Sequence, residues 1–206
     1  EGHHLPAVAL DQFSSTMDLT GLRWLDKLPK ILIEVADKMG FVPAQDVTTL
    51  AQQLKTALLD AGRLAMELVR AVATGYDTVY RFKDGVVPEP MIEPFKLIHG
   101  HAAALSDVLE GLGAELKARA KEDPSQAANC SVHYARLGQM APTLNSVVAT
   151  SAQWLNSDEP PLAKWLKSDT SSGLVSISAH ACPIVPGDLL RRHLWLEILN
   201  EGVLDT

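Results

Sequence analysis

An apolar residue recurs at every third or fourth position between residues 47 and 72 of this chain. These positions are Val47, Leu50, Leu54, Leu58, Ala61, Ala65, Leu68 and Val72. This spacing places the side chains on one face of a long α-helix, and only packing against other helices can bury such a face. A helix of this length needs partners of similar length. The stripe therefore predicts a helical bundle.

Three further segments have the same helical periodicity. We expect the four helices at about 20–39, 43–74, 91–121 and, after the cap-like pair Asp123-Pro124, from there to about residue 155. The short connections between the first and second helices, and between the third and fourth, are typical of antiparallel neighbours. The predicted fold class is therefore all-α: an up-and-down four-helix bundle of long helices with a C-terminal extension.

Three residues inside these segments predict local departures from a regular helix. Pro29 either kinks the first helix or opens its main part, with Trp24 and Leu25 in a preceding turn, and we expect the second. Gly62 lies in the middle of the second helix and predicts a bend or a close approach by another helix. Pro142 predicts a kink in the fourth helix.

The chain divides into three parts by its patterning. We expect a flexible N-terminal tail at 1–15, the helical bundle at 16–157, and a C-terminal extension at 158–206 that packs on the bundle. A long connection at 75–90 is rich in aromatic residues, and either carries function or folds back over the end of the bundle.

The C-terminal extension has a different pattern from the bundle. A short helix is expected at 161–167, with Trp165 on its apolar side. Residues 174–185 are small or β-branched and have no helical spacing, so extended structure is expected there. A final helix is expected from Asp188 to about Glu201, and its apolar residues surround much of it.

Composition excludes some classes of partner. The net charge of −7 argues against binding to a phosphate backbone, and we expect no nucleic-acid partner. No apolar run approaches the ~18 residues of a membrane span. Two cysteines, Cys130 and Cys182, are too few for a disulfide framework, although one bond between them stays open. A reducing, cytoplasmic location is the expectation.

The motifs of catalysis and metal binding are absent from the sequence. His99 and His101 form the densest histidine pair, but a spacing of two residues points them to nearly opposite sides of a helix. No HExxH, GxSxG, GxGxxG or GxxxxGK[ST] motif occurs. We therefore expect no catalytic residue, no metal ligand and no cofactor, and we favour a protein that is not an enzyme.

Two hypotheses of function follow, with a third held open. The first is a non-catalytic interaction module, an adaptor, scaffold or regulatory domain that binds a partner protein or a second copy of itself. The alternative is an internal apolar pocket for a lipid or other hydrophobic small molecule, left by small residues on the stripes. The third is an enzyme without a recognisable local motif. The candidate partner-binding residues are Trp165, Trp195, Leu196, Tyr80 and Phe82.

Overall fold

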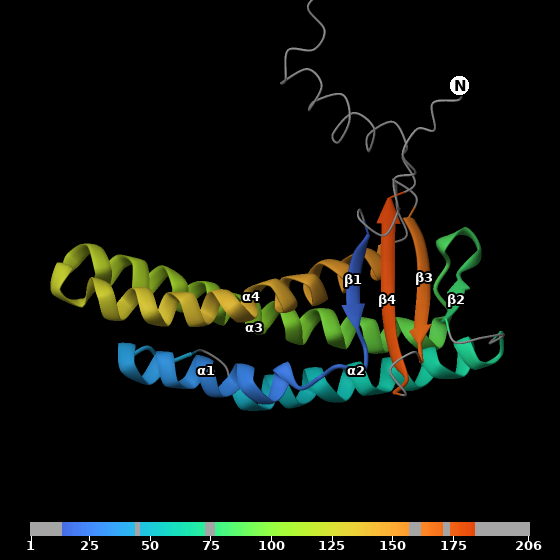
Figure 1. Ribbon diagram of the computed structural model, residues 1–206, viewed down its shortest axis with the longest axis horizontal. Helices are drawn as coiled ribbons and strands as arrows, with labels where there is room; N and C mark the ends of the chain where they lie inside the picture. Colours follow the sequence, from blue (N-terminus) through green and yellow to red (C-terminus); the bar gives the residue numbers. More distant parts are fainter. Residues whose placement is uncertain (1–13, 44–45, 73–76, 157–161, 171–173, 184–206) are drawn as a thin grey trace, which may run out of the picture.

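The computed structural model describes residues 14–43, 46–72, 77–156, 162–170 and 174–183. These residues form four α-helices: α1 (Trp24–Met39), α2 (Val47–Arg70), α3 (Glu89–Glu122) and α4 (Ala127–Leu155). The four predicted helices are thus confirmed, with small differences at their ends. Figure 1 shows α3 and α4 as a long antiparallel hairpin, with α1 and α2 along one side of it.

The prediction of an all-α fold is wrong, because the structure also contains a sheet. Its strands are β1 (Ser15–Asp18), β2 (Asp77–Arg81), β3 (Leu162–Asp169) and β4 (Ser176–Pro183). They pair antiparallel in the order β1-β4-β3-β2. Figure 1 shows the strands crossing the helices near one end of the molecule. The fold is therefore mostly helical, with a small sheet laid across the helices.

Two strands of the sheet, β3 and β4, lie in segments whose structure was predicted from the sequence. The strand β3 occupies the segment predicted as a short helix, so that prediction is wrong. Burial alternates along β3 from one residue to the next, which is the period of a strand, and the inward residues are Leu162, Lys164, Leu166 and Ser168. A charged residue at an inward position hides this alternation from a search for apolar periodicity. The prediction of extended structure at 174–185 is confirmed by β4.

The prediction for Pro29 is also wrong. The helix α1 begins at Trp24, so Pro29 is its sixth residue and lies inside it. Proline at this position removes one helical N–H donor. Leu28 and Leu32, on either side of Pro29, are both fully buried, and the packing of this part of the helix against the core maintains it. Pro142 also lies inside its helix, because α4 continues from Ala127 to Leu155.

Another segment approaches α2 closely at Gly62, but this segment is not the helix that the sequence predicted. A Cβ atom at this position would lie 3.0 Å from the backbone oxygen of Leu19, which follows β1. The approaching segment is therefore the connection from β1 to α1 rather than another helix.

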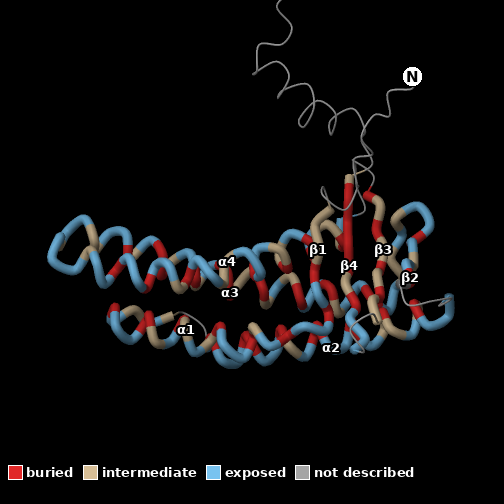
Figure 2. Tube along the Cα trace, viewed as in Figure 1, coloured by how far each residue is buried: buried red, intermediate tan, exposed pale blue. Residues whose placement is uncertain are grey.

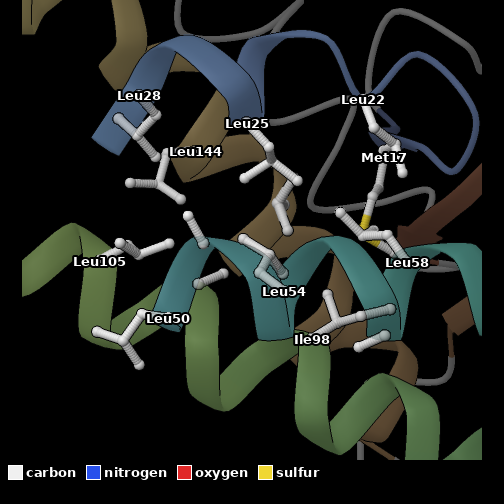
Figure 3. Packing of buried hydrophobic residues seen from close by; sticks show 14 of the residues in the cluster. Met17, Leu22, Leu25, Leu28, Leu50, Leu54, Leu58, Ile98, Leu105 and Leu144 are labelled. Atoms are coloured by element: carbon white, nitrogen blue, oxygen red, sulfur yellow. The ribbon is translucent and has the colours of Figure 1, made fainter. Parts of the chain in front are cut away.

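One hydrophobic core joins the helices to the sheet. Figure 3 shows leucines of α1, α2, α3 and α4 packed together with Ile98 of α3, and Met17 of β1 belongs to the same cluster. The inward residues of the sheet that belong to this cluster are Met17, Leu166, Ile177, Ala179 and Ala181. Figure 2 shows the buried positions on the sides of the helices that face one another, and along β4. Among the described residues, no helix combines the length and the apolar character that crossing a membrane requires.

Candidate functional site

Trp154 joins α4 to α3 and to the sheet. Its indole stacks on Phe95 of α3, with ring centroids 4.4 Å apart and an interplanar angle of 10°. It also meets Phe82 edge-on at 5.2 Å. The indole Nε1 donates a hydrogen bond of 3.1 Å to the backbone oxygen of His180 in β4. A single buried side chain thus holds three elements together at the end of α4.

Lys164 is a buried cation at the same junction. Only 5% of the residue is exposed, because its side chain points inward from β3. The Nζ atom donates to the backbone oxygens of Trp154, at 2.9 Å, and Asn156, at 2.7 Å. These carbonyls belong to the C-terminus of α4, where backbone acceptors lack helical partners and a cation offsets the helix dipole. Burial lowers the pKa of Lys164.

A cavity of about 300 Å³ lies beside Lys164. It is bounded by the turn η2 (Lys83–Gly85) and the residues after it, by α3 near its start, by the end of α4 and by the start of β3. The lining residues are Asp84, Gly85, Val86, Val87, Ile92, Trp154, Leu155, Asn156, Leu162 and Lys164. Most of these side chains are apolar, so the cavity combines an apolar wall with one buried cation.

The outer face of the sheet carries a second cluster. Trp165 of β3 stacks on its cross-strand partner His180, with centroids 5.1 Å apart and an interplanar angle of 5°. The ring of His180 also lies within hydrogen-bond distance of Thr16 Oγ1, at 3.1 Å from Nδ1, and of Ser178 Oγ, at 2.8 Å from Nε2. This cluster is on the side of the sheet opposite the helices, because the neighbouring residue Leu166 points inward and is fully buried.

The structure separates the residues predicted to bind a partner. Trp165 is half-buried on the outer face of the sheet, whereas Tyr80 and Phe82 pack against the core and contact each other edge-on at 5.1 Å. Phe82 is only 7% exposed. Trp195 and Leu196 lie outside the described residues. The described candidates therefore do not form one surface.

The histidines and cysteines do not assemble into a reactive group in the described part of the chain. His99 Nδ1 lies 3.3 Å from Ser151 Oγ, but Ser151 is fully buried and donates to the backbone oxygen of Val147. Cys130 and Cys182 are buried free thiols, and burial raises the pKa of Cys182. Within the described ranges, no group of three or more His, Cys, Asp or Glu side chains could hold a metal ion.

Sequence reasoning missed Lys164 and the cavity beside it. The lysine occurs in the segment LAKWLKSD, where apolar residues are spaced for either a short helix or a strand. Reading this segment as a strand would have placed Lys164 on the same face as Leu162 and Leu166, and thus would have predicted a buried lysine.

No protein-family model matches this chain. It is similar to the ATP-dependent DNA helicase DinG of Photobacterium profundum, with 27% identity over 212 aligned positions. The alignment covers 95% of this chain but 29% of the helicase, so the chain spans less than a third of the length of that relative.

Proposed function

We propose that this chain forms a non-catalytic interaction module of an ATP-dependent DNA helicase that resembles DinG. The observation that carries the proposal is the alignment, which includes 95% of the chain and a limited part of the helicase. An enzyme driven by ATP must bind the phosphates of the nucleotide, and neither GxGxxG nor GxxxxGK[ST] occurs in this sequence. The nucleotide site would therefore lie in the remainder of such a protein.

The arrangement of β1 and β4 supports a module that is joined to neighbouring domains at one place. Ser15, the first residue of β1, pairs with Ala181, close to the end of β4. The start of β1 and the end of β4 are thus at the same end of the sheet, as Figure 1 also shows. Domains whose ends are close together can be inserted into other domains with little disturbance.

The charge of the chain favours protein surfaces as the main contacts of the module. The net charge of −7 opposes strong sequence-independent binding to DNA, which depends on clustered lysine and arginine. In this proposal the module positions other parts of the helicase by protein contacts, and the principal DNA-binding groups belong to those parts.

The first test is to read the open reading frame that encodes this chain. The proposal expects coding sequence in the same frame that includes a GxxxxGK[ST] motif outside these 206 residues. A complete gene without a nucleotide-binding motif would contradict the helicase assignment.

The second test compares the encoded full-length protein with a form that lacks residues 15–183. We expect the deletion to retain ATP binding, because the nucleotide site lies elsewhere, and to lose ATP-dependent unwinding of duplex DNA. The core-disrupting substitution Leu54→Asp in the full-length protein is a second way to disrupt the module, since Leu54 is fully buried in it. Unchanged unwinding by both forms would contradict a functional role for the module, and loss of ATP binding would contradict its separation from the nucleotide site.

A further inference from the structure

We propose that the cavity beside Lys164 is a binding site for a small carboxylate with an apolar body. In this site Lys164 holds the carboxylate and the apolar walls cover the rest of the ligand. The proposal is independent of the helicase assignment, since it depends only on the cavity and its lining.

The size and lining of the cavity suit a small organic ligand. Its volume of about 300 Å³ is at the lower end of the range of small-molecule sites. The residues that make the wall apolar are Val86, Val87, Ile92, Trp154, Leu155 and Leu162. Val86 is 68% exposed. A bound apolar group would cover part of this exposed surface.

The charge of the site specifies the polar part of the ligand. Lys164 carries three N–H donors, of which two are satisfied by the backbone oxygens of Trp154 and Asn156. No ion pair formed among the described residues includes Lys164. A buried cation is costly when no described residue supplies an anionic partner, and a carboxylate that accepts the third donor would lower that cost.

The acidic residue of the lining does not provide this partner. Asp84 belongs to the exposed turn η2 and makes no ion pair with Lys164. It has φ 55°, a left-handed conformation that aspartate adopts in turns more readily than most residues other than glycine. A Cβ atom on Gly85 would clash with the backbone oxygen of Leu162, which shows that the backbone of this turn lies directly against β3.

The test uses three probes of equal chain length: hexanoate, 1-hexanol and hexylamine. Binding to the ¹⁵N-labelled protein is followed through the indole N–H signal of Trp154, assigned by replacing each of the other three tryptophans with phenylalanine. We expect hexanoate to shift this signal saturably and to bind at least about tenfold more tightly than 1-hexanol, because its carboxylate accepts a charge-assisted hydrogen bond. Hexylamine should bind most weakly.

Two lysine variants separate the role of Lys164 from general effects of charge. Lys164→Met removes the cation and keeps the length of the side chain, and we expect it to lose the tenfold preference for hexanoate while 1-hexanol binds as before. Lys167→Met is the matched control, because Lys167 belongs to the same strand but points to the outer face of the sheet. It should keep the preference.

The proposal would be overturned by any of three results. Hexanoate could leave the Trp154 signal unchanged in the wild-type protein, or could bind no more tightly than 1-hexanol. Lys164→Met, if folded by circular dichroism, could keep the full preference. If that variant does not fold, the comparison of the three probes on the wild-type protein still decides the question.

Discussion

Replacing Trp154 with phenylalanine tests whether this residue holds the helices to the sheet. Trp154 is 2% exposed, stacks on Phe95 and donates to the backbone oxygen of His180. Phenylalanine keeps one aromatic ring but cannot donate the hydrogen bond, whose net contribution is about 1 kcal/mol. The smaller ring also removes buried surface equal to roughly two methylene groups, which contributes about 1–2 kcal/mol. We therefore expect Trp154→Phe to lower the free energy of unfolding by about 2–3 kcal/mol.

The assay is urea unfolding followed by far-ultraviolet circular dichroism. A lower midpoint with an unchanged dependence on urea would show a loss of stability without a change in the surface exposed on unfolding. The matched control is Trp165→Phe, the same substitution on the outer face of the sheet. Trp165 is half-buried and stacks on His180, so its replacement should cost less than about 1 kcal/mol. Equal losses in the two variants would refute the role assigned to Trp154.

Two further predictions concern a turn and an ion pair. Gly40 and Gly85 have similar positive φ values of +62° and +67°, but only a Cβ atom at Gly85 would clash with Leu162. We therefore expect Gly40→Ala to lower the free energy of unfolding by about 1–2 kcal/mol, from the backbone conformation alone. Gly85→Ala should lower it by more, and urea unfolding measures both. Equal losses would mean that the turn moves away from β3. Hydrogen bonds from Arg136 lower the pKa of Glu34 from 4.5 to about 2. The ionised Glu34 carboxylate therefore stabilises the fold fully above pH 4.5, and this stabilisation is lost as the pH falls toward 2. The stability difference between wild type and Glu34→Gln should therefore narrow between pH 4.5 and pH 3, and a constant difference would contradict this ion pair in solution.

The helices could be predicted because their signal is local. The stripe that includes Leu50, Leu54 and Leu58 repeats with the period of an α-helix, and all three residues are buried against other helices in the structure. Gly62 likewise indicated a close approach, since glycine in the middle of a helix permits another backbone to come near, although the sequence predicted a helix there and the structure has the connection after β1. These features need only the residues of one segment.

The sheet could not be assembled from the sequence in the same way. Its four strands come from the segment before α1, the connection between α2 and α3, and the two segments after α4. Each strand becomes stable only through pairing, and most of the pairing partners lie far away in the chain. The buried position of Lys164 follows only once its segment is known to be a strand, because an isolated lysine predicts an exposed residue.

The sequence by itself thus determined four amphipathic helices and the absence of the familiar nucleotide and metal motifs, because periodicity and motif spacing are properties of short segments. Only the tertiary structure decided that distant strands pair across one end of the helices, that Trp154 and Lys164 meet at the end of α4, and that a cavity remains beside them. The physical reason is that strand pairing and the burial of a charge depend on partners that the chain brings together only when it folds.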